Sequence, residues 1–224
     1  MAAIDSARIS LATGIAVLGL KFLAYYWTGS VALYSDALES FVNVAGALAA
    51  LAALIVAIRP ADSRHPYGHA KAEYFSAVFE GVLIVVAALT IIQESWPRLF
   101  HPQAVTGLDW GIAASILAST LNAALARYLV HQGDRLSSPA LRADGLHIWS
   151  DVVTSVGVLI GIGLAVWTGW WLLDPLLAVL VALNILWVGG GLIRDSLGGL
   201  MDESLPEEDL TRVKTLVKDA MTGA

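Results

Sequence analysis

Apolar residues dominate six stretches of the chain, and each stretch is long enough to cross a bilayer, which takes about 17 to 25 residues in a helix. Short polar breaks that contain proline and glycine separate these stretches, as is typical of connections between helices. The pattern predicts an all-α integral membrane protein with six transmembrane helices. The spans begin near Ile9, Val31, Tyr74, Trp110, Leu141 and Pro175.

Strongly basic residues fall at alternate ends of the six spans, whereas the opposite connections hold most of the tryptophans that could form an interfacial belt. Because cytoplasmic loops are enriched in lysine and arginine, we expect both the N- and C-termini to be cytoplasmic. The basic residues are Arg8, Arg59, Arg64, Lys71, Arg127, Arg135, Arg142 and Arg194. The tryptophans are Trp27, Trp96, Trp110, Trp170 and Trp171.

The composition agrees with a membrane protein and restricts the chemistry. The chain is 57% hydrophobic and 14% charged, with a mean hydropathy of +0.70. It contains no cysteine, so a metal can bind only through nitrogen and oxygen ligands. The net charge of −6 and the absence of a basic run argue against nucleic-acid binding.

The sequence divides into two parts at the end of the sixth span. We expect residues 1–200 to form the transmembrane domain. Residues 201–224, "MDESLPEEDLTRVKTLVKDAMTGA", have the pattern of the amphipathic start of a cytoplasmic C-terminal domain. This segment is too short to form a core, so we expect that domain to be truncated.

Two apolar spans carry the same polar stripe. Residues 36–43 read "DALESFVN" and residues 144–151 read "DGLHIWSD". Positions i, i+3 and i+7 share one face of a helix, so each span presents three polar side chains on one side. The stripes consist of Asp36, Glu39 and Asn43 on the second span, and of Asp144, His147 and Asp151 on the fifth.

The members of the two stripes nearest to mid-membrane can converge if the helices touch. Glu39, Asn43, His147 and Asp151 would then form a four-ligand cage of nitrogen and oxygen atoms, which suits a divalent cation. The alternative is interhelical hydrogen bonding without a metal. An ionisable side chain at the membrane centre costs about 2.5–3.5 kcal/mol even on gentle scales, which favours the metal site, with Asn43 as its weakest member.

The connection after the second span carries another candidate metal site. In "ADSRHPYGHAKAE", Asp62, His65 and His69 have a D-x2-H-x3-H spacing that a short loop can fold around Zn²⁺. Histidines in a hydrophilic loop are also often simply solvated, and the spacing alone leaves both interpretations open.

Three further ionisable residues lie within the spans or near their ends. We expect Lys21 and Glu94 to extend to the outer membrane interface, with pairing between Lys21 and Asp36 as an alternative. Glu80 lies deeper in the third span, and its pattern leaves open a structural or a proton-handling role.

Four motifs together resemble the cation diffusion facilitator transporters, and the resemblance covers nearly the whole chain. They are "YSDALES", "RPADSRHPYGHAKAEYF", "ADGLHIWSDVVTSVGVLIG" and "GLMDESLPEE". The resemblance implies six transmembrane helices, a cytoplasmic domain of ferredoxin-like fold and a homodimer. It also implies export of Zn²⁺ or a related divalent ion in exchange for protons.

The resemblance also implies roles for individual residues. The family's transport site falls on Glu39, Asn43, His147 and Asp151, and the loop site of bacterial relatives falls on Asp62, His65 and His69. Lys71 and Asp202 occupy the positions of an ion pair between subunits. The chain departs from the family where Glu39 and Asn43 replace the usual His or Asp followed by Asp, which makes Asp36 an alternative fourth ligand.

Taken together, these features predict a divalent metal efflux transporter of a bacterial cytoplasmic (inner) membrane. Its partners are metal ions, protons, lipid and a second copy of the chain, and no prosthetic group is expected. Zn²⁺ is the first candidate for the cargo, and the harder ligand set keeps Fe²⁺, Mn²⁺, Co²⁺ and Cd²⁺ open. Protons that bind His147, Asp151 and Glu39 would expel the metal and couple transport to antiport by alternating access.

The same sequence features leave alternatives to an antiporter. A metal sensor or a passive metal channel would share the same ligands without proton coupling. A membrane metalloenzyme is not expected, because the chain has no HExxH motif and no Ser beside a base in a recognisable arrangement.

Overall fold

The computed structural model describes residues 2–136, 139–201 and 211–217. Six long helices follow one another along the chain, and all six are long and apolar enough to span a membrane, as predicted. Residues 211–217 form a further short helix, and the described residues contain no strand. The long helices are α1 (Ala2–Thr28), α2 (Val31–Ala57), α3 (Ala72–Phe100), α4 (Leu108–Arg135), α5 (Pro139–Thr168) and α6 (Leu173–Leu200).

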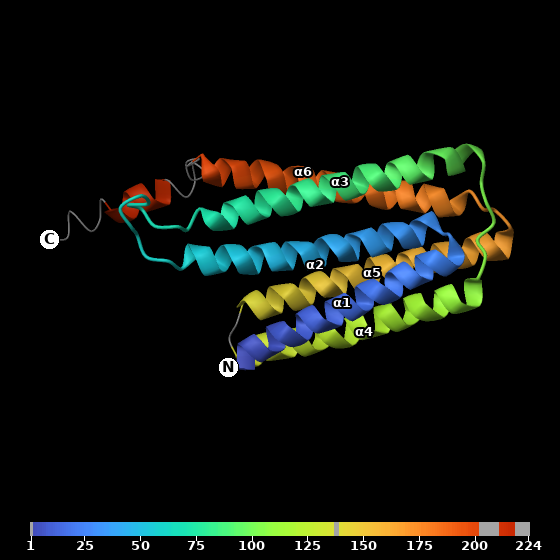
Figure 1. Ribbon diagram of the computed structural model, residues 1–224, viewed down its shortest axis with the longest axis horizontal. Helices are drawn as coiled ribbons and strands as arrows, with labels where there is room; N and C mark the ends of the chain where they lie inside the picture. The colour runs from blue at the N-terminus through green and yellow to red at the C-terminus, as the bar shows by residue number, and fades with distance from the viewer. Residues whose placement is uncertain (1, 137–138, 202–210, 218–224) are drawn as a thin grey trace.

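The helices are arranged as a group of four and a pair. Helix α4 packs against α1 and α5, and α2 packs against α1, while α3 lies along α6 and also contacts α2. Figure 1 shows the α3–α6 pair beside the group formed by α1, α2, α4 and α5. Helix α2 therefore connects the two groups, and it is one of the two helices that carry a polar stripe.

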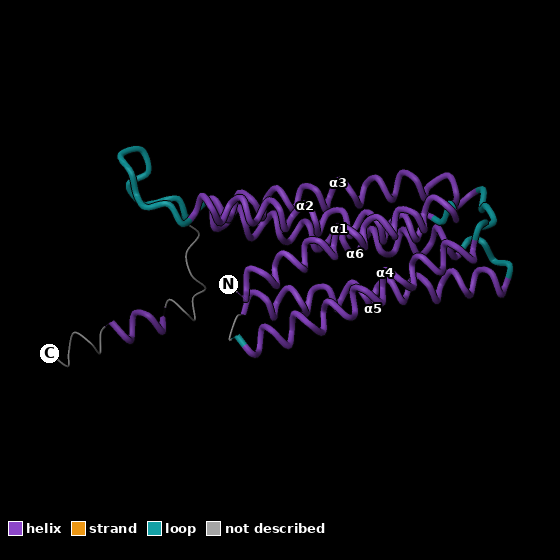
Figure 2. The backbone as a smooth tube through the Cα atoms, turned by 60° about the horizontal axis from the view of Figure 1, so that its bottom comes forward, coloured by secondary structure: helices purple, strands orange, loops and turns teal. Residues whose placement is uncertain are grey.

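The ends of the helices gather the basic residues on one side, as the sequence predicts. The start of α1, the α2–α3 connection, the α4–α5 connection and the end of α6 lie at the same end of the bundle (Figures 1 and 2). We call this end, which carries Arg8, Arg59, Arg142 and Arg194, the basic end. The other end contains the short turns between α1 and α2 and between α5 and α6, together with the α3–α4 connection.

Small residues allow α3 and α6 to pack closely. A Cβ atom placed on Gly81 of α3 would lie 3.2 Å from the carbonyl oxygen of Gly189 on α6. The backbones of the two helices therefore touch where each lacks a side chain. In a membrane, where lipid tails are as apolar as leucine, this close van der Waals contact is a main source of helix association.

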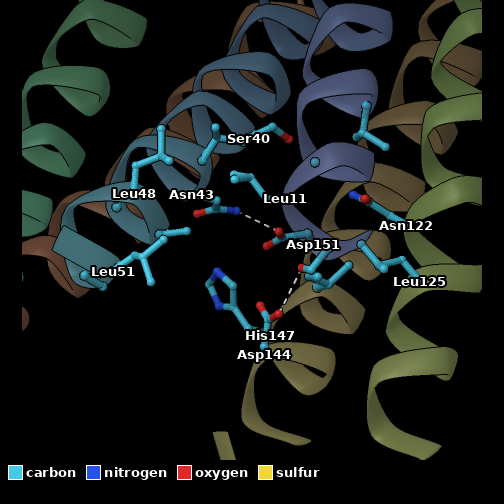
Figure 3. A pocket seen from close by; sticks show the side chains of 18 of the residues that line it. Leu11, Ser40, Asn43, Leu48, Leu51, Asn122, Leu125, Asp144, His147 and Asp151 are labelled. Carbon is cyan, nitrogen blue, oxygen red and sulfur yellow. Dashed lines mark hydrogen bonds between the residues drawn. The ribbon is translucent and has the colours of Figure 1, made fainter. Parts of the chain in front are cut away.

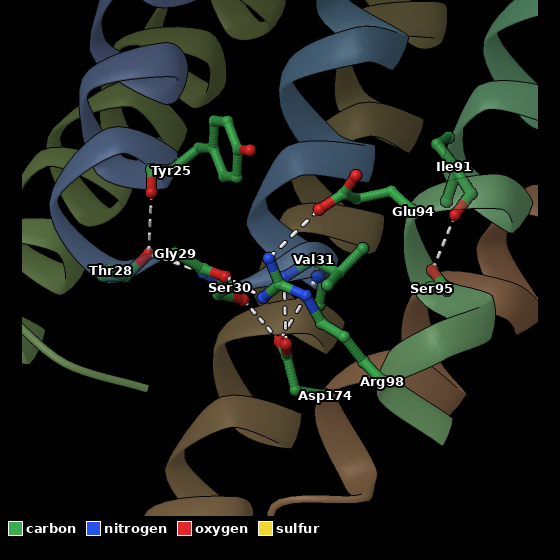
Figure 4. A network of polar contacts seen from close by, with 11 residues as sticks. Tyr25, Thr28, Gly29, Ser30, Val31, Ile91, Glu94, Ser95, Arg98 and Asp174 are labelled. Carbon is green, nitrogen blue, oxygen red and sulfur yellow. Dashed lines mark hydrogen bonds and ion pairs between the residues drawn. The ribbon is translucent and has the colours of Figure 1, made fainter. Parts of the chain in front are cut away.

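A buried carboxylate fixes the tight turn between α1 and α2. Asp174, at the start of α6, accepts hydrogen bonds from the backbone N–H groups of Val31 (2.9 Å) and Ala32 (3.2 Å). It also accepts one from the Ser30 hydroxyl (Figure 4). The Ser30 oxygen in turn accepts the N–H of Leu33 at 3.1 Å. Free N–H groups at a helix start need such acceptors, so Asp174 ties the start of α2 to the start of α6.

Removal of the Asp174 carboxylate should destabilise the bundle. In Asp174→Ala, two backbone donors and one hydroxyl lose their acceptor in a buried site, which costs about 1–3 kcal/mol. We expect a melting temperature several degrees below that of the wild type, measured on the protein in detergent by circular dichroism.

The matched control is Asp109→Ala, which removes an exposed carboxylate from the first turn of α4. This control should melt close to the wild type. Equal melting temperatures for Asp174→Ala and Asp109→Ala would show that the capping contact does not hold the turn.

Candidate functional site

A cavity of about 730 Å³ lies in the half of the bundle toward the basic end. Residues of α1, α2 and α5 form most of its wall, and α3 and α4 complete it. Its polar lining includes Asn43, Asp144, His147 and Asp151, which Figure 3 shows facing the same space. The later part of the α2 stripe and the α5 stripe therefore meet in one cavity.

Asn43 and Asp151 make the direct contact between the two stripes. The side-chain amide of Asn43 on α2 donates a hydrogen bond of 2.7 Å to Oδ2 of Asp151 on α5 (Figure 3). Asp151 is only 7% exposed, although it lines the cavity. The two helices therefore touch at these positions, which is the condition under which the sequence lets the two stripes converge.

Glu39 and His147 lie on either side of this contact along the helices. Glu39 is half-buried, and its carboxylate interacts electrostatically with those of Asp151 and Asp36. His147 is exposed to the cavity, one helical turn before Asp151. Among the described residues, the ligand atoms of Glu39, His147 and Asp151 do not all lie within 4.8 Å of one another. Asn43, His147 and Asp151 line the cavity, whereas Glu39 is not among its lining residues, so the four predicted ligands do not form a closed coordination shell.

Other charged groups line the cavity nearer to the basic end. The Ser10 hydroxyl on α1 donates a hydrogen bond of 3.0 Å to Asp144 (Figure 3). Glu80 projects from α3 toward α2, where a Cβ on Gly46 would lie 2.7 Å from its Cδ atom. Its carboxylate also interacts electrostatically with His147. Acidic groups from α3 and α5 therefore face the part of the cavity that lies between the basic end and Asp151.

Asp36, the alternative fourth ligand, is occupied by another partner. Lys21 Nζ on α1 lies 2.8 Å from Asp36 Oδ1, and both side chains are almost fully buried. The Ser155 hydroxyl on α5 also donates to this oxygen, at 2.6 Å. The expectation that Lys21 extends to the membrane interface is wrong, because the nearby carboxylate offers it a buried partner. Glu94 is exposed, as expected, and pairs with Arg98 at 3.1 Å.

The α2–α3 connection gathers the three residues of the predicted loop site. Their ligand atoms lie within 4.8 Å of one another, as a shared metal ion requires. Asp62 Oδ1 lies 3.1 Å from His65 Nδ1, and Asp62 Oδ2 lies 3.7 Å from His69 Nε2. Figure 2 shows this connection projecting from the basic end of the bundle. The spacing seen in the sequence therefore does produce a local cluster of suitable ligands.

Asp62 is held in its charged form by the loop backbone. The backbone N–H groups of His65 (2.7 Å) and Arg64 (2.8 Å) donate to Asp62 Oδ1 and lower the pKa of this carboxyl group below its usual value. The hydrogen bonds stabilise the charged form of the carboxylate. Asp62 is thus available as an anionic ligand even at mildly acid pH.

The predicted pair of Lys71 and Asp202 lies only partly within the described residues. Lys71 Nζ donates a hydrogen bond of 3.1 Å to the carbonyl oxygen of Leu200, at the end of α6. Asp202 lies outside the described residues, as does much of the predicted C-terminal segment. The ion pair between subunits stays a prediction.

Three polar residues that join different helices were not found by sequence reasoning. They are Ser10, Ser155 and Asp174, and each becomes informative only when a distant helix is placed beside it. Asp174 carried a local signal, since it stands directly before a proline at the start of a span. Ser155 is one turn after Asp151, and the polar stripe of α5 could have been extended to include it.

Comparison with known proteins gives one family. The model of the cation efflux transmembrane domain matches residues 7–201. An uncharacterized transporter of Synechocystis sp. is 49% identical over 207 residues, which are 92% of this chain and 67% of that protein. The cation-efflux pump FieF of Shewanella oneidensis is 31% identical over 96% of this chain and 72% of its own length. FieF of Klebsiella pneumoniae is 29% identical over 95% and 70%, respectively.

The loop cluster generates a first binding prediction. We expect Asp62→Asn and His69→Ala each to bind one Zn²⁺ fewer per chain than the wild type, as counted by isothermal titration of the detergent-solubilised protein. Loop binding should weaken as the pH falls from 7 to 5, because protons compete for imidazole nitrogens. The lowered pKa of Asp62 keeps this carboxylate from contributing to that loss.

The control is His101→Ala, which removes an exposed histidine from the α3–α4 connection at the opposite end of the bundle. It should bind as much Zn²⁺ as the wild type. Unchanged stoichiometry in both loop variants would show that the three side chains are merely solvated.

Proposed function

The chain belongs to the cation efflux family, and we propose that it exports a divalent transition-metal ion in exchange for protons, by alternating access of a site between α2 and α5. The family and its bacterial relatives identify a multi-pass cation efflux transporter of the bacterial inner membrane. The ion, the coupling to protons and the residues of the site are the proposed part.

The contact between Asn43 and Asp151 carries the proposal. It joins an amide and a carboxylate from two helices, at the inner part of a cavity and in the middle of apolar spans. A buried carboxylate in a membrane is expensive unless it is paired or used, and such residues commonly lie on ion pathways. Small movements of α2 and α5 would bring Glu39 and His147 to the same ion.

The ligand types favour first-row divalent ions. Two carboxylates, one imidazole and one amide oxygen offer nitrogen and oxygen donors and no sulfur. Zn²⁺ accepts four such ligands in a tetrahedral arrangement. The neutral amide and the two carboxylates form a harder set than a histidine-rich site, which keeps Fe²⁺, Mn²⁺, Co²⁺ and Cd²⁺ as further candidates.

Proton coupling follows from competition for the same lone pairs. Carboxylates and imidazole bind a metal only when they are deprotonated, so metal binding releases protons and protonation releases metal. His147, Asp151 and Glu39 are the groups that would exchange protons for the ion. No separate proton pathway is required for this exchange.

The position of the cavity supports loading of metal from the basic end. It extends from Arg8, near the basic end, to Asp151, and exposure decreases along this path from His147 to Asp151. If the basic end is cytoplasmic, as the positive-inside rule predicts, this conformation would load metal from the cytoplasm. Efflux then requires a second conformation that opens to the other side. In the proposed assembly, two copies of the chain form a dimer.

Transport in vesicles tests the proposal. We expect sealed proteoliposomes with wild-type protein to take up Zn²⁺ in response to an imposed pH gradient, measured with an enclosed fluorescent indicator. Asp151→Ala and His147→Ala should lower the uptake at least about tenfold, because each removes a charged or nitrogen ligand. The same assay with Fe²⁺, Mn²⁺, Co²⁺ and Cd²⁺ identifies the preferred ion.

Glu94→Gln is the matched control, since it removes an exposed carboxylate of α3 far from the cavity lining. Its uptake should equal that of the wild type. Flux that persists without a pH gradient and does not saturate would indicate a passive channel. Metal binding without flux would indicate a sensor.

Asn43 should tune the choice of ion. Asn43→His replaces an amide oxygen by an imidazole nitrogen, which Zn²⁺ accepts more readily than Mn²⁺ does. We expect the ratio of Zn²⁺ to Mn²⁺ uptake to rise by about tenfold, and Asn43→Asp to change the ratio in the opposite direction. Both ratios come from the vesicle assay under a constant pH gradient.

Asn122→Ala, which alters a cavity-lining amide on α4, is the control for general effects on the cavity. Its ratio of Zn²⁺ to Mn²⁺ uptake should equal that of the wild type. An unchanged ratio in both Asn43 variants would place Asn43 outside the coordination shell.

A further inference from the structure

Lys21, Asp36 and Ser155 form a closed polar triad that joins three helices. Lys21 Nζ donates to Asp36 Oδ1 at 2.8 Å and to Ser155 Oγ at 3.1 Å, and the Ser155 hydroxyl donates to the same Asp36 oxygen at 2.6 Å. The side chains are 1%, 2% and 1% exposed. The triad therefore binds α1, α2 and α5 to one another in a site without access to solvent.

The triad lies next to the proposed ion site, on the side away from the basic end. Asp36 precedes Glu39 by one turn of α2, and Ser155 follows Asp151 by one turn of α5. Both offsets point toward the opposite end of the bundle, and neither triad residue on these helices lines the cavity. An ion that enters from the basic end would reach Asp151 and then meet the triad.

An apolar layer follows the triad one turn farther along each helix. Ala24 on α1, Leu33 on α2 and Val158 on α5 belong to one buried cluster, and each is at most 3% exposed. Each lies three residues beyond its triad neighbour, toward the end that the cavity does not reach. The triad and this layer together separate the cavity from that end of the bundle.

We propose that the Lys21–Asp36–Ser155 triad is the latch that keeps the transport path closed on the side away from the basic end, and that it must separate each time the ion site opens to that side. Its three members are positioning residues and bind no ion themselves. Asp36 is unsuited to hold the cargo, because Lys21 already neutralises its charge. The inference rests on the proposed function, since a latch matters only in a protein that alternates between two conformations.

The physical basis is the cost of separating a buried ion pair. When one partner of such a pair leaves, the other remains as an uncompensated charge in an apolar site. This cost opposes any movement that pulls α1, α2 or α5 away from the other two helices. It therefore favours the closed arrangement. Because Asp36 and Ser155 share helices with Glu39 and Asp151, ligands that close around an ion would also shift the triad. The latch thus connects metal binding to opening.

The chain contains no cysteine, which permits a direct test with single introduced thiols. Val158→Cys places a thiol in the apolar layer beyond the triad, and Ala47→Cys places one in the cavity on the other side of the ion site. Each is labelled with a membrane-impermeant maleimide, in intact cells and in inverted membrane vesicles. Comparison of the labelling rates in cells and in inverted vesicles shows from which side of the membrane each thiol is accessible. The rate itself reports how often the thiol is accessible.

The triad is removed in a charge-balanced way by Lys21→Met with Asp36→Asn. In this double variant we expect the thiol of Val158→Cys to react from the side away from the basic end about tenfold faster or more. Labelling of Ala47→Cys from the basic end should fall in the same variant. Opposite changes at the two positions are the signature of a shifted equilibrium, whereas a merely loosened bundle would speed both reactions.

Ser155→Ala provides a milder variant that keeps both charges and folds more safely. It loses two hydrogen bonds of the triad and should speed labelling of Val158→Cys by about three- to tenfold. Glu94→Gln, which breaks the exposed pair with Arg98, is the control and should leave both rates unchanged. All variants are first checked for a single symmetric peak in gel filtration.

Unchanged labelling of Val158→Cys in both the double variant and Ser155→Ala would overturn the latch. A parallel rise at both thiols would also overturn it, in favour of a purely structural role for the triad. Labelling requires no metal flux, so the outcome is independent of the vesicle assay. If the vesicle assay shows no transport but the two thiols still change their labelling rates in opposite directions, the proposed transport function fails and the latch is still supported.

Discussion

The structure depends on how it satisfies carboxylates that lie inside an apolar bundle. Three of them are nearly fully buried, and each finds its partner on another helix. Asp174 accepts the free N–H groups at the start of α2, Asp36 pairs with Lys21, and Asp151 accepts the amide of Asn43. A membrane offers no water to replace these partners, so each carboxylate fixes the relative position of two helices. These contacts tie α2 to α1, α5 and α6.

These contacts also divide α2 into parts with different tasks. At its start, α2 is capped by Asp174, which joins it to the start of α6. One turn later, Asp36 joins α1 and α5 in a closed triad. Farther along, Asn43 faces a cavity large enough for a hydrated ion and reaches Asp151 across it. Polar contacts thus change from closed to accessible along one helix, which is the arrangement that a transporter loading from one side requires.

Sequence reasoning predicted the six spans and proposed candidate site residues, because both follow from local periodicity. Apolar length predicted all six spans, and the i, i+3, i+7 stripes placed Asn43 and Asp151 on facing sides of two helices. The spacing of Asp62, His65 and His69 left a metal site and simple solvation open, and only the folded loop shows that their ligand atoms gather. For Lys21 the first expectation, extension to the interface, was wrong, and the alternative, pairing with Asp36, is confirmed. A lysine inside a span can do either. Only the placement of α1 beside α2 decides between these outcomes, and no local pattern encodes that placement.

The partner of each carboxylate indicates which one can hold a cation. Lys21 carries a positive charge, so its pair with Asp36 is electrically neutral and repels a metal ion about as much as it attracts one. Asn43 is neutral, so its hydrogen bond satisfies one oxygen of Asp151 while the negative charge remains. A carboxylate that must accept and release cargo in every cycle needs such a partner, which orients it without cancelling its charge. Asn43 therefore suits the proposed transport site because it is not ionised, and Asp36, though only one turn from Glu39, suits the proposed latch.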